Sequence, residues 1–409
     1  MRLSSNSQIF IGAALGIAGG FIMMQVGVTQ SAVQQILFIC KLIGGLFISL
    51  LKMILIPLVF TSITVGIANL RAHKQMNKVW KLSLLYYIST TALAVLLGLA
   101  VVNIFKPGAG LEIAMFKDSM VTLDTRGLTM PEFIENFLLN LFVNPFQAMA
   151  QGMVLPTIMF AIFLGIAIIV AKDEKAKVVL SFLNEMFDLI MMLVNWIMKI
   201  LPIGIMALLA QLVATQDPSL FAALGKFIIV VVGATLFHGF VSLPLLLIIF
   251  TKLSPIVYFK GVREALITAF STSSSSATLP ITYRCVKDNL NVNKDVAGFV
   301  LPLGATINMD GTALYEAVAA IFIANLVGID LNLAQQLIVF FMAILASIGA
   351  PGIPSAGMVT MIMVLQAVGL PVEAIAILYP IDRLLDAVRT MVNVEGDTIG
   401  SLIVDQYTR

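Results

Sequence analysis

Charged residues are scarce in this 409-residue chain: Asp, Glu, Lys and Arg make up only 11% of it, against about 25% in an ordinary soluble domain. Hydrophobic residues reach 60%, and 24 basic side chains nearly balance 22 acidic ones. A chain so close to neutral offers no electrostatic footprint for nucleic acid, and we expect no such partner. The two cysteines, Cys40 and Cys285, match no disulfide or metal-ligand spacing. The composition therefore excludes a soluble enzyme and predicts a protein of the lipid bilayer.

Long apolar runs predict an all-α polytopic membrane protein. The first run, residues 9–28, has no small-residue cleavage site, so we expect a retained span rather than a signal peptide. With it, the later apolar segments predict about eight membrane-crossing helices; these segments are 33–70, 82–105, 130–170, 178–213, 220–251, 296–328 and 371–405. Several exceed about 25 residues and should be tilted, bent or broken.

Basic residues gather in alternate loops, which the positive-inside rule assigns to the cytoplasm. These loops lie near residues 71–81, 172–177 and 252–294. The loops around Asp217, Asp330 and Glu373 carry no Lys or Arg and should face outside. Without an organelle-targeting segment, we expect a multi-pass protein of a bacterial inner membrane or another plasma membrane.

Two stretches would leave one side of the membrane and return to it. Residues 254–288 begin and end on the basic side around the tip STSSSSATLP (271–280), and residues 331–370 return to the outside around SIGAPGIPSAG (347–357). Their flanks are apolar and long, which favours re-entrant hairpins over flexible loops. Hairpins on opposite sides of the membrane indicate an inverted repeat, whose broken helices bind substrate and ions near the midplane. The sequence therefore predicts a transporter.

The last apolar segment carries a polar stripe. At about 100° per residue, six side chains fall on one face about 100° wide; they are Asp382, Asp386, Arg389, Thr390, Asn393 and Asp397. Ionisable groups inside a membrane are functional candidates. Arg389 offers a planar fork that suits a carboxylate, and Asp386, one turn earlier, suits an ammonium. Together they predict a site for an amino acid with a second carboxylate, whereas the alternative is that Arg389 only pairs with Asp386 or Asp382.

A second polar group lies in GATINMDGT (304–312). Asp310 beside Gly311, with carbonyls loosened by local unwinding, suits a small hard cation such as Na⁺. Three hydroxyls within about one turn could complete the cage; they belong to Tyr87, Thr90 and Thr91. Further along, Glu316 is either a carboxyl that carries a proton across the membrane or a neutral acid bonded to a neighbour.

Four motifs in order resemble the dicarboxylate/amino acid:cation symporters, the glutamate transporter family. They are STSSSSATLP, NMDGTALYEAVAAIFIA (308–324), SIGAPGIPSAG and DAVRTMVNVEGD (386–397). The segment LLKMILIPLVF (50–60) and the number of spans agree as well. The resemblance implies uptake of the acidic amino acids L-glutamate and L-aspartate, with Na⁺ as coupling ion, H⁺ and K⁺ as further candidates, and no other cofactor. It also implies a homotrimer that works by an elevator motion, with each protomer acting alone.

The same resemblance implies two domains. A scaffold and trimerisation domain would comprise residues 1–70 and 130–213, which hold helices one, two, four and five. A transport domain would comprise residues 80–105 and 220–409, with helices three, six, seven and eight and hairpins at about 254–288 and 331–370. The outer hairpin would be the extracellular gate.

Individual roles follow from the resemblance as well. Arg389 would bind the side-chain carboxylate of the substrate and Asp386 its amino group, in a pocket completed by Thr312, Thr390, Asn393, Ser275 and Gly357. One Na⁺ site would use Gly304, Asn308, Asn393 and Asp397. A second would use carbonyls of Thr306, Ser347, Ile348 and Ala350. A third would use Tyr87, Thr90, Thr91, Asn308 and Asp310. Glu316 would carry the proton and matter for the return step with K⁺.

The chain departs from the family pattern in its arginines. It lacks the second arginine that members place at the position of Ser273 or of Ala387. Arg383, about one turn before Asp386, could supply that charge from a new direction. Glu395 lies on the opposite side of the helical wheel from the stripe and receives no role.

Other functions are less consistent with these residues. A neutral amino acid exchanger of the same family would generally replace the arginine at position 389. A remote alternative, an intramembrane aspartyl protease, could pair Asp310 with Asp397. An intramembrane serine protease would need a base near Ser273–Ser276, but the one histidine in an apolar segment, His238, is interpreted as a packing residue.

Overall fold

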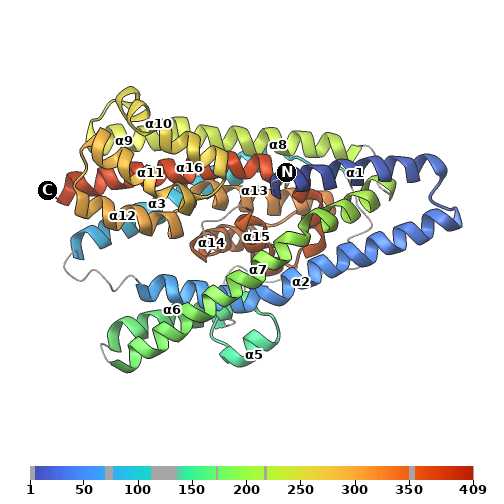
Figure 1. Cartoon of the computed structure of the whole chain (residues 1–409), viewed down its shortest axis with the longest axis horizontal. Coiled ribbons are helices and arrows are strands. Elements are labelled where there is room, and N and C mark those ends of the chain that lie inside the picture. Colours follow the sequence, from blue (N-terminus) through green and yellow to red (C-terminus); the bar gives the residue numbers. More distant parts are fainter. Residues whose placement is uncertain are drawn as a thin grey trace.

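The chain folds into a bundle of helices (Figure 1). The computed structural model describes residues 5–69, 77–111, 135, 138–139, 141–171, 174–215, 219–349 and 355–408. Within these ranges every regular element is a helix, which confirms the predicted all-α class. Two elements, η3 and η4, are π-helical and one, η5, is 3₁₀.

The elements have the following bounds. They are, in chain order, α1 (Ser5–Val26), α2 (Ser31–Asn69), α3 (Asn77–Phe105), α5 (Pro145–Ala150), α6 (Val154–Ala171), α7 (Glu174–Thr215), α8 (Ser219–Phe237), η3 (His238–Ser242), α9 (Leu243–Thr251), α10 (Pro255–Thr272), α11 (Ser275–Arg284), η4 (Cys285–Asn289), α12 (Lys294–Ile307), α13 (Asp310–Leu326), α14 (Leu333–Gly349), α15 (Ala356–Ala367), η5 (Val372–Ala374) and α16 (Ile375–Thr408).

Five helical stretches of the described residues are long and apolar enough to cross a membrane. They are Ser31–Ala68, Lys78–Phe105, Ala176–Ile197, Ser219–Thr251 and Lys294–Leu326. Shorter apolar helices, such as Ile11–Val26 and Pro156–Ala171, accompany them. The chain is thus a multi-pass membrane protein, and the number of eight crossings stays a prediction.

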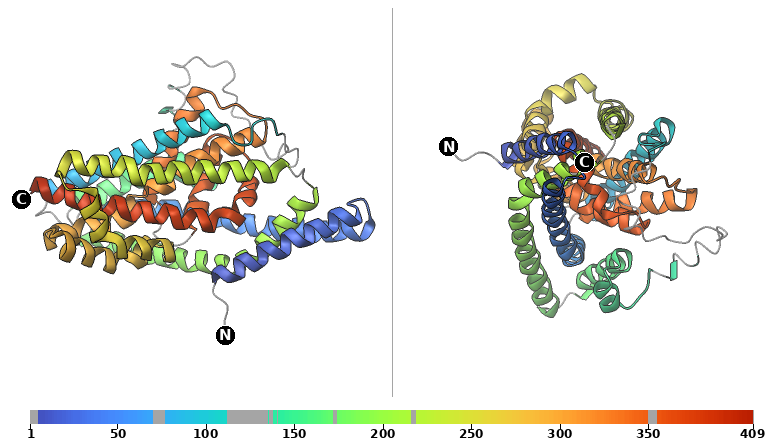
Figure 2. Two further views of the ribbon diagram at one scale, coloured as in Figure 1. Left: turned by 90° about the horizontal axis from the view of Figure 1, so that it is seen from above. Right: turned by 90° about the vertical axis from the view of Figure 1, so that its right-hand side faces the viewer.

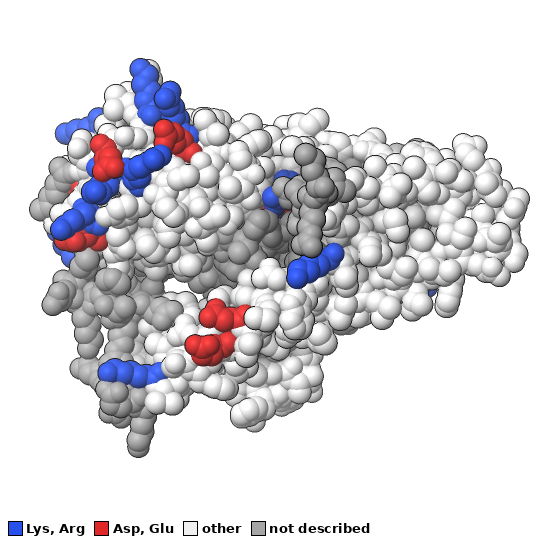
Figure 3. All heavy atoms as spheres, in the orientation of Figure 1, with Lys and Arg blue, Asp and Glu red and all other residues white. Residues whose placement is uncertain are grey.

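Charged side chains are unevenly distributed over the surface. On the face in Figure 3, many of them gather at the end where α9, α10, α11 and α12 begin or end, and the opposite end, where α1 joins α2, is almost free of charge. The exposed basic residues at the charged end include Lys252, Lys260, Arg263, Arg284 and Lys287. An uncharged surface of this extent suits contact with lipid.

Helix α7 packs along both α1 and α2 (Figure 1). Gly12, Gly16 and Gly20 recur every fourth residue on the face of α1 that meets α7. A Cβ atom built on Gly16 would lie 2.5 Å from the carbonyl oxygen of Met206, and one on Gly12 would lie 2.4 Å from that of Pro202. Glycine at this spacing lets two membrane helices approach closely.

Helix α13 lies at the centre of the second half of the chain. It packs against α3, α8, α14, α15 and α16, and nearly all its side chains are buried. Helix α16 runs lengthwise through the bundle with α8 beside it (Figure 2, left). Residues of α13 and α16 can therefore contact one another in the buried interior of the bundle.

The first predicted hairpin has the expected helix–turn–helix form, and the second has two helices that pack on each other. In the first, α10 ends at Ser273, which takes the left-handed conformation with φ of +50°, and α11 begins after the N-cap Ser274. In the second, α14 packs on α15. Residues 350–354 of its tip lie outside the described residues.

The predicted unwinding in GATINMDGT is confirmed. Helix α12 ends at Ile307 and α13 begins at Asp310, because Asn308 (φ −102°, ψ 84°) and Met309 (φ −120°, ψ 58°) leave the helical conformation. The break separates two helices that together form one candidate span. It also frees backbone groups that a continuous helix would use internally.

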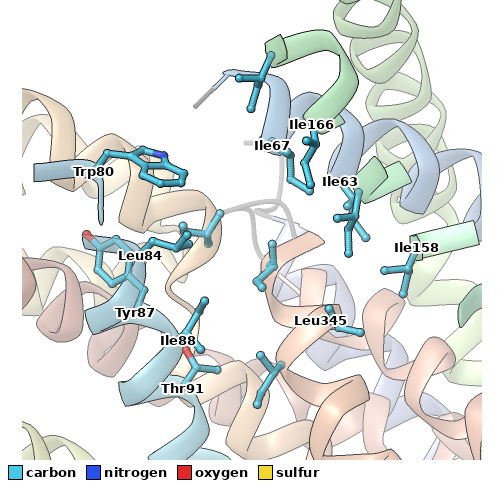
Figure 4. A pocket seen from close by; sticks show the side chains of 16 residues that line it. Ile63, Ile67, Trp80, Leu84, Tyr87, Ile88, Thr91, Ile158, Ile166 and Leu345 are labelled. Atoms are coloured by element: carbon cyan, nitrogen blue, oxygen red, sulfur yellow. The ribbon is translucent and has the colours of Figure 1, made fainter. Parts of the chain in front are cut away.

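A cavity of about 740 Å³ separates α2 and α6 from α3, α12 and α14 (Figure 4). Its lining is almost wholly aliphatic, with Ile63 and Ile67 on one wall and Leu84 and Ile88 on the other. Tyr87 and Thr91 contribute hydroxyls at one side. The two groups of helices thus face each other here across an apolar space.

The glycine contact between α1 and α7 can be tested with one substitution and one control. We expect Gly16→Val to lower the stability of the folded protein by about 1–3 kcal/mol, because the added side chain overpacks the interface. Gly19→Val carries the same helix-propensity cost, but a Cβ there meets nothing within 4 Å. Thermal unfolding in detergent should show a lower melting temperature for Gly16→Val than for Gly19→Val. Equal melting temperatures would contradict the close contact.

Candidate functional site

The polar stripe of α16 is buried along its whole length. Each of its six predicted residues is at most 5% exposed, and Arg389 is completely buried. Because they lie on one face of a single helix, they meet α13 and the hairpins together rather than lipid. The prediction of one interior polar face is confirmed.

Arg389 makes two ion pairs through one of its nitrogens. Nη2 donates to Oδ1 of Asp382 at 2.7 Å and to Oδ1 of Asp386 at 2.9 Å. Its Cζ atom lies 4.0 Å from the ring centre of Tyr315, a cation–π distance. The pairing that the sequence left as an alternative therefore exists in this structure.

The pairing leaves most of the guanidinium fork unused. Buried Nε and Nη1 of Arg389 have no hydrogen-bond partner among the described residues. Gly357 leaves room beside Nη1, because a Cβ atom built on it would lie 3.5 Å away. Two buried donor nitrogens without acceptors are costly unless a ligand satisfies them. A carboxylate carries the opposite charge and accepts hydrogen bonds from such donors.

Asp386 connects the stripe to both hairpins. Its Oδ2 accepts the backbone N–H of Ser355, in the second hairpin, at 2.8 Å. Nη1 of Arg383 lies 3.5 Å from the same oxygen, and Nη2 of Arg383 donates to the carbonyl of Thr272, in the first hairpin, at 3.5 Å. Arg383 thus brings a second positive charge beside Asp386, as its spacing predicted.

Asn393 links α16 to the start of α13. Its Oδ1 accepts the backbone N–H of Gly311 at 2.8 Å, and its Nδ2 donates to Oγ1 of Thr312 at 3.2 Å. A Cβ atom on Gly311 would lie 2.7 Å from the carbonyl oxygen of Arg389, so the two helices meet closely. Of the other predicted pocket residues, Thr390 lies on α16 and Ser275 begins α11, which packs against α16; both are buried.

A second cluster surrounds the carboxylate of Asp310. Oγ1 of Thr91 donates to Oδ1 of Asp310 at 2.6 Å, and Oγ1 of Thr90 lies 3.4 Å from the same atom. Thr90 also lies 3.5 Å from Oδ1 of Asn308. The hydroxyl of Tyr87 donates to the carbonyl of Val300 at 2.8 Å. The structure thus brings the hydroxyls of α3 to the break between α12 and α13.

Asp397 and Gly304 lie beside this cluster. Nδ2 of Asn308 donates to Oδ1 of Asp397 at 2.9 Å. A Cβ atom on Gly304 would lie 2.2 Å from that oxygen and 2.7 Å from the hydroxyl of Tyr87. Only a glycine lets the backbone of α12 approach the two oxygens so closely.

The chemistry of this cluster fits a small hard cation. Asp310 and Asp397 are buried, and neither forms an ion pair with a Lys or Arg among the described residues. A buried carboxylate without a counter-charge is strongly unfavourable. The surrounding groups are hydroxyl, amide and carboxylate oxygens, which are the donors that such a cation prefers.

The other predicted ion site is described only in part. Thr306 lies in the last turn of α12, and Ser347 and Ile348 lie in the last turn of α14, which packs against α12. Ala350 lies outside the described residues. The structure therefore brings the two helix ends together, and the cation site itself remains a prediction.

Glu316 faces the second hairpin. The completely buried carboxyl is hydrogen-bonded through Oε1 to the hydroxyl of Thr360 on α15, and its Oε2 has no partner among the described residues. Thr360 also lies within hydrogen-bond distance of the carbonyl of Gly357, at 3.3 Å. A protonated Glu316 could donate to the Thr360 hydroxyl while that hydroxyl donates to the backbone.

The interpretation of His238 as a packing residue is wrong. Its Nε2 lies 3.2 Å from Oδ2 of Asp310, and both side chains are completely buried. The same contact places this histidine at a carboxylate rather than at Ser273–Ser276, which also removes the serine protease alternative. A single histidine in a long apolar segment was a signal in the sequence that this residue has a function. The sequence did not show its partner, because Asp310 lies 72 residues away.

Buried clusters of opposite charge, held between broken helices of a multi-pass membrane protein, define a transporter rather than an enzyme. The sequence profile of the sodium:dicarboxylate symporter family matches residues 6–407, and the chain belongs to this family. The family is sodium-coupled and of the elevator type.

Curated relatives agree over most of the chain. A putative sodium-dependent excitatory amino acid transporter, glt-4, of Caenorhabditis elegans is 36% identical over 97% of this chain and 88% of its own length. Excitatory amino acid transporter 2 of Rattus norvegicus is 37% identical over 96% and 77%. Excitatory amino acid transporter 3 of Mus musculus is 36% identical over 90% and 79%.

The close approach at Gly304 gives a test of the cation cluster. We expect Gly304→Ala to raise the Na⁺ concentration needed for half-maximal thermal stabilisation by more than about tenfold, because its Cβ displaces Asp397 or Tyr87. Gly298→Ala, also in α12, is the control, since its nearest neighbour would be 4.0 Å away. The measurement is the melting temperature in detergent as Na⁺ replaces choline. The site would be misplaced if both variants respond to Na⁺ like the unsubstituted protein.

Proposed function

We propose that this protein is a secondary active symporter that takes up L-glutamate or L-aspartate across a plasma membrane, driven by the Na⁺ gradient. The observation that carries the proposal is that two nitrogens of the buried Arg389 guanidinium, Nε and Nη1, have no hydrogen-bond partner among the described residues. The excitatory amino acid transporters at 36–38% identity support it, because their names describe the transport of excitatory amino acids.

The charges of the site suit such a substrate. The side-chain carboxylate would accept a hydrogen bond from the free Nη1 of Arg389, and the ammonium would bind Asp386. Thr312, Thr390 and Asn393 would line the remainder, with Ser275 and Gly357 from the two hairpins. Since Ser355 of the second hairpin donates to Asp386, a substrate at that carboxylate would affect the hairpin directly.

The coupling ion would bind at the clusters around Asp310 and Asp397. Tyr87, Thr90, Thr91 and Asn308 would complete one site with Asp310, whereas Gly304, Asn308 and Asn393 would complete another with Asp397. A further site would use carbonyls of Thr306, Ser347, Ile348 and Ala350. Buried carboxylates that pair with no Lys or Arg among the described residues support the assignment, because a bound cation supplies the missing charge.

Glu316 would add coupling to H⁺ and K⁺. Its buried carboxyl forms no ion pair with a described residue, and its hydrogen-bonding partner Thr360 lies in the second hairpin. A proton on Glu316 would then cross the membrane with the substrate, and the deprotonated carboxyl would favour a K⁺-loaded return. The hairpin can respond to the state of Glu316 through Thr360.

The elevator motion would divide the chain into a scaffold and a transport domain. The scaffold would contain residues 1–70 and 130–213, which would also form a homotrimer, and the transport domain would contain 80–105 and 220–409. The apolar cavity between α2 and α6 on one side and α3, α12 and α14 on the other supports this division. A surface with few polar contacts lets one body slide past another without breaking hydrogen bonds.

Two alternatives are less favoured. An exchanger of neutral amino acids would leave Arg389 without a carboxylate. An aspartyl protease would need Asp310 and Asp397 to share a proton, but each carboxylate is bonded to a different partner, Thr91 and Asn308 respectively.

The substrate assignment is tested by replacing the fork with a point charge. We expect Arg389→Lys to reduce uptake of radiolabelled L-aspartate and L-glutamate into proteoliposomes at least about tenfold, because a single ammonium cannot pair with Asp382 and Asp386 and also present a separate nitrogen to the substrate carboxylate. An inward Na⁺ gradient drives the uptake. Arg284→Lys is the control, since Arg284 is exposed and pairs with the exposed Glu264. Unchanged uptake by Arg389→Lys, or no Na⁺-driven uptake by the unsubstituted protein, would reject the proposal.

The role of Glu316 needs its own measurement. In proteoliposomes that contain K⁺, net uptake by the unsubstituted protein should be faster than in vesicles that contain choline. Glu316→Gln should lose this acceleration, because the amide neither releases a proton nor attracts K⁺. Glu264→Gln, an exposed acid-to-amide change, is the matched control. Glu316 would have no such role if its glutamine variant still responded to internal K⁺.

A further inference from the structure

One of the chain's two histidines lies against the proposed cation cluster. His238 comes from the span formed by α8, η3 and α9, which contributes none of the groups assigned to the substrate or to Na⁺. Its imidazole is completely buried, as is the carboxylate of Asp310 that it meets. A polar side chain buried this deeply is retained for a specific contact.

The local geometry of the span brings the imidazole to this position. The π-helical element η3 begins at His238 and ends at Ser242, so the helix is locally widened where the histidine leaves it. The next residue, Gly239, packs against α16, and a Cβ atom there would lie 3.0 Å from Oε2 of Glu395. A π-bulge next to a close-packed glycine redirects side chains, and such bulges are frequent at functional sites.

The two oxygens of Asp310 have different partners. Oδ1 meets the hydroxyls of Thr91 at 2.6 Å and of Thr90 at 3.4 Å, which are proposed Na⁺ ligands. Oδ2 meets Nε2 of His238 at 3.2 Å. An ionised carboxylate only accepts hydrogen bonds, so the imidazole must carry its hydrogen on Nε2 and donate it. The plane of the carboxylate is then held between α3 and η3.

We propose that His238 is a positioning residue of the sodium site: its Nε2–H holds Oδ2 of Asp310 so that Oδ1 faces the hydroxyls of α3. The inference rests on the proposed sodium site and adds a residue outside the ligand set. Partners that orient a metal ligand typically contribute about 10- to 100-fold to metal affinity. His238 does not touch the cation in this arrangement, and acts through the orientation of Asp310.

Two amide substitutions separate positioning from packing. His238→Gln places an N–H donor close to the position of Nε2, whereas His238→Asn places its donor near Nδ1, too short to reach Asp310. We expect His238→Asn to need about 10- to 100-fold more Na⁺ for half-maximal thermal stabilisation, and His238→Gln to lie near the unsubstituted protein. The titration is done in detergent without substrate, with choline replacing Na⁺. Rescue by glutamine is the readout that a purely structural role would not give.

Controls keep the result interpretable. Thr235→Val removes a buried hydroxyl one turn earlier on α8 that has no hydrogen-bond partner among the described residues, and it should leave the Na⁺ titration unchanged. His238→Met fills the space of the imidazole without a donor. It replaces His238→Asn if that variant does not fold, and the same loss of Na⁺ affinity is expected.

The outcomes are distinct for the two proposals. If the unsubstituted protein is not stabilised by Na⁺, the sodium site itself is wrong and the role of His238 falls with it. If the unsubstituted protein responds but His238→Asn and His238→Met titrate like it, the sodium site stands and the positioning role is rejected. Equal losses in the Asn and Gln variants would also reject it, because the position of the donor would then not matter.

Discussion

The interior of this bundle depends on one constraint, which is that charge removed from both lipid and water must be paired. Arg389, Asp382 and Asp386 lie on one face of α16 at a spacing that brings both carboxylates to the same guanidinium nitrogen. Arg383 adds a second cation beside Asp386. Two acids and two arginines thus balance within little more than two turns of helix, which makes a buried charged helix tolerable. The balance is incomplete in hydrogen bonds, since Nε and Nη1 of Arg389 remain unsatisfied.

A second constraint comes from the backbone. Non-helical segments at membrane depth persist only where protein covers them. The break at Asn308 and Met309 meets this condition, because both residues are buried. Glycines set how closely the surrounding helices approach: Gly304 admits the carboxylate of Asp397, and Gly311 admits the backbone of α16. These two glycines, which have no side chain, therefore allow the close packing around the carboxylates of the proposed cation cluster.

Sequence periodicity predicted the features that repeat along one element. The stripe of α16 follows from helical spacing alone, and the break at 308–309 and the turn at Ser273 follow from residues that disfavour a continuous helix or lipid contact. Contacts between distant elements carry no such signal. His238 and Asp310 are 72 residues apart, and Glu316 and Thr360 are 44 apart, so each partner was unpredictable before the helices were placed. The glycines of α1 were visible at a spacing of four, but their partner helix α7 was not.

The two clusters are joined at the start of α13, and this junction explains how ion and substrate binding can depend on each other. Three consecutive residues have three different attachments: Asp310 bonds to the hydroxyls of α3, the N–H of Gly311 bonds to Asn393, and Thr312 bonds to the amide of the same asparagine. Asn393 lies one turn after Arg389 on α16. With the proposed sites, a cation that pulls on Asp310 would move the backbone that positions Asn393 and Thr312 in the substrate pocket. Because coupling between two sites is reciprocal, the substrate would then favour the same arrangement of Asp310 that the cation does. Because Asp310, Gly311 and Thr312 lie on one helical turn, the two proposed sites can be coupled without any intervening residues.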